Sequence, residues 1–254
     1  MKFSFIIIFF IIILFIKKED FTNIIPKKNV QPSILHLVLF SHDNGPYDMM
    51  YQLTSKFYKL YPNVTTYYYC FDPTMNKEYK IKGDILYIKG NEDYIPNILD
   101  KTIKAFEYFN KVIDYDYIVR SNISTIINFN LLSEKLLRDK PEYGGGVNLI
   151  EELNPTGGMI KLYYVSGTNI ILSKKIVNRI LKNKNNINYN LIDDVAIGLL
   201  IRDYMPDIEL TSYNEYYNEF STLENIETDI FYRNRTDNRY DDVKNMKLII
   251  NNIT

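Results

Sequence analysis

Residues 116–124 (DYIVRSNIS) decide which fold this sequence predicts. Asp116–Arg120 is apolar and β-prone enough for a buried strand, and small polar residues follow it at once. Strand character resumes over Thr125–Phe129. A buried strand that carries polar side chains at its carboxyl end is how an open α/β sheet presents a ligand site. An ordinary strand and turn would have the same local pattern, so the rest of the chain has to decide between the two.

Upstream of this stretch, strand-like and helix-like segments alternate. Strands are expected at 34–40, 64–71 and 84–88, and helices are expected to begin at Pro46 and Pro96. The alternation predicts a mostly parallel sheet with right-handed crossovers, flanked by helices. This first part has the pattern of a nucleotide-binding half.

Downstream of Phe129 the pattern changes, and the rest has the pattern of an acceptor-binding half. The expected elements are, in order, a helix over 131–137, flexible turns at 144–146 and 155–158, a strand over 163–172 interrupted at 166–168, a helix capped by Ser173, a helix from 193 through 202, and short strand-like pieces over 203–254. No internal repeat or linker interrupts 34–254, so a single domain is expected there.

Composition excludes several classes of function. The 254 residues carry a formal net charge of −1, and no basic run exceeds two residues, so nucleic acid is not an expected partner. The single cysteine, Cys70, excludes an intrachain disulfide and any zinc site built from cysteines. His36 and His42 are the only histidines, which leaves little for metal chemistry or for a histidine base.

The N-terminus begins with an apolar run, Phe3–Ile16, that lysines flank on both sides. As a helix it would be roughly 21 Å long, short of a hydrocarbon core of about 30 Å, but the lysines could extend its span. We expect residues 1–18 to be an uncleaved signal-anchor helix, with a cleaved signal peptide as the alternative, and 19–33 to be a short stem. The expected localisation is a single-pass membrane protein of the secretory pathway or an equivalent compartment.

Three constellations could carry chemistry. Asp193 and Asp194 begin a helix, where they are either an N-cap with a first-turn acid or a general base held at a cleft. The segment 164–168 places Gly167 between small hydroxyl residues, which indicates either a close approach by another molecule or a bulge. Asn122 and Ser124 can hydrogen-bond a ligand but are poor ligands for a hard divalent cation.

Taken together, these residues resemble the β1,3-glycosyltransferases of the GT-A fold, the group that includes β1,3-galactosyltransferases and the Fringe proteins. The resemblance is carried by blocks that occur in the family's order: 83–86 with 93–102, 117–128, 164–173 and 193–198. It covers roughly residues 34–200 and is weak after about residue 205. It implies a GT-A domain over 34–254 that moves a sugar, with inversion, from a nucleotide-sugar to an acceptor hydroxyl.

The resemblance also implies roles for individual residues. The general base falls on Asp194, with Asp193 beside it in the catalytic site. The donor, a UDP-sugar, would be bound by the residues Ser41, Asp84, Lys101, Arg120, Asn122 and Ser124. The acceptor, a glycan or glycoprotein, would lie against Gly167 and Thr168.

One block departs from the family. Its acidic metal-binding triplet aligns with Asn122-Ile123-Ser124, which contains no carboxylate. The transfer could be independent of metal, with Arg120 or other cations stabilising the departing diphosphate, or Asn122 could hold Mn²⁺ weakly together with the phosphates. Alternatively, the domain has lost transfer and acts as a glycan-binding or scaffold protein. A further alternative is an unrelated nucleotide-binding α/β protein, whose ligand would also bind at the carboxyl ends of the strands.

Overall fold

An eight-stranded mixed sheet runs through the computed structural model, which describes residues 31–153, 159–218 and 229–254. Its strand order is β11-β7-β10-β5-β1-β2-β4-β3. The strands are β1 (Ile34–Leu39), β2 (Val64–Asp72), β3 (Tyr79–Lys82), β4 (Ile85–Lys89), β5 (Tyr117–Asn122), β7 (Tyr143–Gly145), β10 (Asn169–Ser173) and β11 (Leu210–Ser212). Four of them, β4, β2, β1 and β5, are neighbours and run parallel, as the alternation predicted.

The sheet is mixed because its outer strands reverse. β3 is antiparallel to β4, and β10 is antiparallel to both β5 and β7. Two small sheets accompany it, one of β12 (Glu215–Asn218), β13 (Phe231–Asn234) and β6 (Thr125–Ile127), and one of β8 (Val147–Leu153) and β9 (Met159–Val165). The expected strand over 163–172 is therefore two strands in different sheets, joined by residues 166–168.

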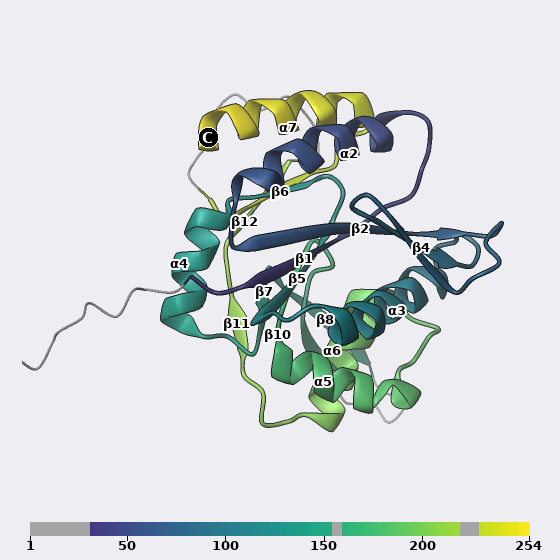
Figure 1. Cartoon of the computed structure of the whole chain (residues 1–254). Helices are drawn as coiled ribbons and strands as arrows, with labels where there is room; N and C mark the ends of the chain where they lie inside the picture. Colours follow the sequence, from purple (N-terminus) through teal and green to yellow (C-terminus); the bar gives the residue numbers. More distant parts are fainter. Residues whose placement is uncertain (1–30, 154–158, 219–228) are drawn as a thin grey trace, which may run out of the picture. The chain divides into compact units, whose positions relative to one another are not determined.

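Helices cover both faces of the central sheet. Figure 1 shows α2 (Pro46–Phe57) and α7 (Arg239–Ile253) together on one face, and α3 (Asn97–Val112), α5 (Lys174–Lys182) and α6 (Asp193–Tyr204) on the other. α4 (Phe129–Asp139) follows β6. Pro32–Thr254 is one compact unit.

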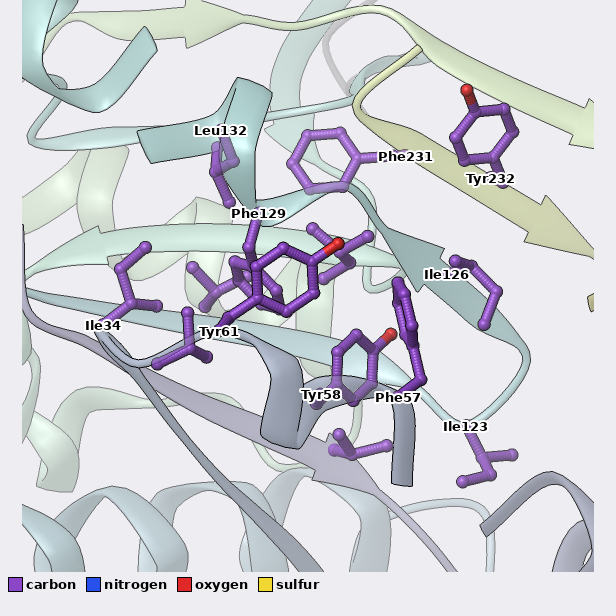
Figure 2. Close-up of a cluster of buried hydrophobic side chains, with 14 of the residues drawn as sticks. Ile34, Phe57, Tyr58, Tyr61, Ile123, Ile126, Phe129, Leu132, Phe231 and Tyr232 are labelled. Carbon is purple, nitrogen blue, oxygen red and sulfur yellow. The ribbon is translucent and has the colours of Figure 1, made fainter. Parts of the chain in front are cut away.

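The sequence of β1 explains why both faces are covered. Successive strand side chains point to opposite faces, so Ile34 and Val38 enter one buried cluster while Leu35 and Leu37 enter the other. Figure 2 shows the first cluster, in which the ring of Tyr61 lies between Ile34 and Tyr58. A strand that is apolar on both faces belongs in the middle of a sheet covered by helices on each side.

Three expectations about the second half of the chain are wrong in detail. Gly144–Gly146 was expected to be a flexible turn, but Gly144 and Gly145 lie in the buried strand β7. Phe129 was expected to end a strand, but Asn128 accepts from the Leu131 amide and caps α4 there. The tail was expected to hold only short strands, but it ends in the fifteen-residue helix α7.

The apolar run at the N-terminus lies outside the described residues, as does the expected turn at 155–158, so the signal-anchor and the stem stay predictions. Within the described ranges, no helix is both long enough and apolar enough to cross a membrane.

Candidate functional site

A cleft of about 1040 Å³ opens where the parallel strands end. Ser41 follows β1, and Asn122 and Ser124 lie at the end of β5 and just after it, and all three line the cleft. The parallel register sets Leu39 opposite Asn122, so these polar residues come to the same edge of the sheet. Carboxyl ends of neighbouring parallel strands are where open α/β sheets bind ligands.

The second half of the chain supplies the opposite wall. The loop between β9 and β10 brings Gly167 and Thr168 to the cleft, and the start of α6 brings Asp193 and Asp194. The Gly167 amide donates to Asp194 Oδ2 over 2.8 Å, which ties the loop to the helix. The structure thus brings Asn122 and Asp194, which are far apart in the sequence, into one cleft.

The side chain of Arg120 contacts residues of both walls of the cleft. Its side chain is 1% exposed. Nη1 donates to Asn122 Oδ1 over 3.1 Å and also to the Gly167 carbonyl, and Nε donates to the Tyr69 hydroxyl over 3.3 Å. Nη2 lies 2.5 Å from Asp193 Oδ2 in a close ion pair. The guanidinium is therefore surrounded by partners that belong to the protein itself.

The charges of Arg120 and Asp193 depend on each other. Burial alone would lower the pKa of the Arg120 guanidinium, but the Asp193 carboxylate reverses this and holds the pKa above its usual value. Burial raises the pKa of Asp193, and the charge of Arg120 opposes that rise. Because removal of one partner of a buried pair leaves the other charge uncompensated, the two side chains act as a unit.

Asp194 is the more accessible of the two acids. Its Oδ2 accepts from the Gly167 amide, and its Oδ1 accepts from the Val195 amide over 2.9 Å. Neither aspartate is the N-cap, because Ile192 occupies that position, so both acids lie in the first turn of α6.

Glycines explain how closely these elements approach. A Cβ on Gly167 would lie 2.9 Å from Arg120 Nη1 and 3.3 Å from Asp194 Oδ2. A Cβ on Gly198 would lie 2.6 Å from the Cβ of Tyr164, which shows that α6 packs directly on β9. Gly167 and Gly198 are thus places of close contact, which the pattern alone could not distinguish from a bulge.

Two of the remaining expected donor residues lie in different places. Lys101 lines the cleft, and its Nζ contacts Glu92 Oε2 at 2.5 Å and the Phe40 carbonyl at 3.2 Å. Burial lowers the pKa of Lys101, and Glu92 opposes this. Asp84 does not line the cleft. It lies at the amino end of β4, where its Oδ1 accepts from the Tyr51 hydroxyl over 2.6 Å.

The residues at 122–124 do not fit a divalent cation. Asn122 Oδ1 accepts from Arg120, and Ser124 Oγ accepts from Arg233, so both oxygens lie against a positive guanidinium that would repel a metal cation. In the three described ranges, no group of three or more histidine, cysteine, aspartate or glutamate side chains is arranged to hold a metal ion.

The C-terminal tail contributes residues that the sequence did not single out. Arg233, Arg235 and Arg239 line the cleft near Ser124, and Tyr217 lies with them. A usable signal was present, since three arginines fall within seven residues that contain only one acid, Asp237. The net charge of the whole chain does not reveal these arginines, because acidic residues elsewhere balance their charge.

Comparisons with known proteins find likenesses among solved structures. No family model matches the chain, and no curated protein matches it. Among solved structures, a glycosyltransferase involved in glycosylation of the major capsid of PBCV-1 has 10% identity and a TM-score of 0.49, covering 85% of this chain and 100% of that one.

The galactosyltransferase LgtC, in complex with donor and acceptor sugar analogues, has 14% identity and a TM-score of 0.38, covering 72% of this chain and 75% of that one. The bifunctional IspDF from Campylobacter jejuni has 16% identity and a TM-score of 0.37, covering 66% and 47%. Likenesses this distant assign neither a family nor a function, so the resemblance to the β1,3-glycosyltransferases stays a prediction.

Proposed function

We propose that this chain is an inverting glycosyltransferase of the GT-A type, which moves a sugar from a nucleotide-sugar to an acceptor hydroxyl. The observation that carries the proposal is the shared cleft of Asn122 and Asp194. One wall comes from the carboxyl ends of parallel strands, where nucleotides bind in open sheets. The other wall presents a carboxylate, which inverting transfer needs on the face of the sugar opposite the leaving nucleotide.

Asp194 acts as the general base. Its carboxylate is held by two backbone amides, so its orientation is fixed while lone pairs remain for a substrate. As the acceptor oxygen attacks the anomeric carbon, its proton passes to Asp194, and the electron pair of the broken glycosidic bond goes to the diphosphate. A base must lie within hydrogen-bond reach of the proton it takes, and Gly167 and Thr168 beside Asp194 form the surface that positions the acceptor.

Asp193 and Arg120 act as positioning residues. Their ion pair connects the start of α6 to the end of β5, and Arg120 adds the hydrogen bonds to Asn122 and Gly167. The pair thereby keeps the Asp194 side of the cleft at a fixed distance from the donor side. Preorganisation of this kind matters because small displacements of a catalytic group reduce rates strongly.

A second candidate is a GT-A-like domain that binds glycans without transfer. The observation that favours it is the absence of a carboxylate in Asn122-Ile123-Ser124. Both candidates predict that a nucleotide-sugar or a glycan binds in the cleft, but they differ in turnover.

A thermal-shift screen of the full-length chain with UDP- and GDP-sugars, each with and without Mn²⁺, tests the binding step. A donor at ten times its dissociation constant should raise the free energy of unfolding by about 1.4 kcal/mol, or the melting temperature by roughly 3–6 °C. Stabilisation by one nucleotide-sugar supports the proposal. If no nucleotide-sugar stabilises the chain while free glycans do, the glycan-binding candidate replaces it.

We also propose that residues 1–18 anchor the chain in a membrane, on the strength of the flanked apolar run alone. Flotation of the full-length chain with lipid vesicles, compared with a chain that begins at residue 19, measures this directly.

A further inference from the structure

The wall of the cleft that faces Asn122 and Ser124 carries three arginines that the proposed chemistry above does not use. Arg233 lies in β13, Arg235 follows that strand, and Arg239 is the first residue of α7. β13 pairs with β6, and the register sets Arg233 opposite Thr125, directly after Ser124. Figure 2 shows Phe231 and Tyr232 of the same strand beside Ile126 of β6. We call Arg233, Arg235 and Arg239 the arginine cluster.

Arg233 is buried without a carboxylate partner. It is 9% exposed, and Nη1 donates to Ser124 Oγ. Its Nε has no hydrogen-bond partner, and no ion pair to Arg233 occurs, among the residues that the structure describes. Burial and the neighbouring Arg239 lower the pKa of Arg233 to about 10. A buried, unpaired guanidinium is costly, and the cost is relieved when an anion binds beside it.

Arg235 and Arg239 add to the positive charge around Arg233. Arg235 is exposed, and its side chain makes no hydrogen bond or ion pair within the described ranges. Arg239 pairs through Nη1 with the buried Asp242, but its Nε also lacks a partner among the described residues. The nearby carboxylate of Glu215 hydrogen-bonds with Thr168 and Asn169, and its charge also opposes the lowering of the Arg233 pKa.

The form of the cluster selects a class of ligand. Guanidinium groups present forked N–H donors that match phosphate oxygens two at a time, and three like charges close together repel one another unless an anion lies between them. A ligand with several anionic oxygens, such as a diphosphate, satisfies all of these groups at once.

We propose that the arginine cluster binds the diphosphate of the nucleotide-sugar donor and balances its charge without a divalent cation. This inference rests on the proposed function. In such a site, arginine side chains supply the positive charge that a metal ion would otherwise supply. This explains why Asn122 and Ser124 contact guanidinium groups. As the bond between the anomeric carbon and the diphosphate oxygen breaks, its electron pair stays on that oxygen, and the cluster stabilises the charge that develops there.

The cluster, rather than Arg120, is the diphosphate site. Arg120 is 1% exposed, and four of its five N–H donors contact Tyr69, Asn122, Gly167 and Asp193, so at most one is left for a phosphate. The arginine cluster lines the same cleft, and the exposed Arg235 side chain has no hydrogen bond or ion pair among the described residues.

Isothermal titration of the full-length chain with inorganic pyrophosphate, in EDTA and then in Mn²⁺, tests the cluster. The test variant is Arg235→Gln, because this exposed side chain holds no other element in place. The matched control is Arg138→Gln, an exposed arginine of α4 that lies outside the cleft and pairs with its neighbour Asp139. Wild type and control should bind pyrophosphate in EDTA with equal affinity, and Arg235→Gln should bind it at least tenfold more weakly at an unchanged melting temperature.

Two results overturn the inference. One is binding of pyrophosphate only in the presence of Mn²⁺, and the other is wild-type affinity in Arg235→Gln. The failure of the proposed function would look different, because pyrophosphate would bind through the cluster while no nucleotide-sugar was consumed. If nucleotide-sugars are consumed only with Mn²⁺ and equally by Arg235→Gln, the glycosyltransferase stands and the arginine cluster does not.

Discussion

Gly167 is the residue at which the two halves of the cleft come closest. Its carbonyl accepts from Arg120 and its amide donates to Asp194, so the backbone has no room for a side chain. The sequence singled out this glycine but could not say what approaches it, because the contacts come from elements far away in the chain.

The first prediction concerns Gly167→Ala. The new methyl group meets Arg120 Nη1 at 2.9 Å and displaces the guanidinium or the loop. We expect donor consumption to fall about tenfold or more, because a displacement near 1 Å at a reacting group costs rate on that scale. The control is Gly45→Ala, whose Cβ would meet its nearest neighbour at an ordinary 3.4 Å. Equal activity in both variants would contradict the tight contact.

A second prediction at this scale concerns His36 and pH. Burial lowers the pKa of His36 to about 3, with its Nε2 against Ser121 Oγ at 2.8 Å. The unfolded chain therefore binds this proton more readily, and the stability that the neutral ring gives is complete above about pH 6.5 and is lost as the pH falls toward 3.

Urea unfolding at several pH values, for wild type and His36→Gln, measures this effect. Between about pH 6 and pH 4 the wild type should lose up to about 1.4 kcal/mol per pH unit more than the variant. A difference between the two proteins that stays constant over this range would show that the ring is not buried as a neutral group.

At the scale of elements, the helices with strong start signals were predictable and the tail was not. Ser173 caps α5 through the Ile176 amide, as its position before an apolar stripe predicted. α7 was missed although Asn238 caps it and Asp241 and Asp242 fill its first turn. Its buried face includes polar side chains, so its apolar periodicity is weak, and its pairing with α2 is a tertiary effect.

The buried face of α7 gives a third prediction. Met246 is fully buried, whereas Leu248 on the same helix is 39% exposed. Met246→Ala should lower the free energy of unfolding by about 2–5 kcal/mol through lost contacts and a cavity, and Leu248→Ala should change it by no more than about 0.5 kcal/mol. Denaturant unfolding measures both. Similar losses in the two variants would mean that α7 does not pack by this face.

For the molecule as a whole, the parallel centre of the sheet was predictable because periodicity is a local property. The reversal at β10 and the small sheets were not, because which strands pair depends on contacts between distant segments. The same limit applies to the site. Most residues of both walls could be named from the sequence, although Asp84 lies elsewhere. The three arginines were visible as a basic segment, but their place in the cleft was not, because only the pairing of β13 with β6 brings the tail to Ser124.

If the cleft transfers sugar, Asp194 takes the proton of the acceptor hydroxyl. The direct measurement is consumption of the bound nucleotide-sugar, followed by NMR with a panel of glycan acceptors, for wild type and Asp194→Asn. Asparagine keeps the size of the side chain but cannot accept a proton as a carboxylate does. Asp194→Asn should bind the donor within about twofold of wild type and lose turnover by about 100-fold or more, on the order of general-base catalysis. Full turnover in Asp194→Asn would contradict it.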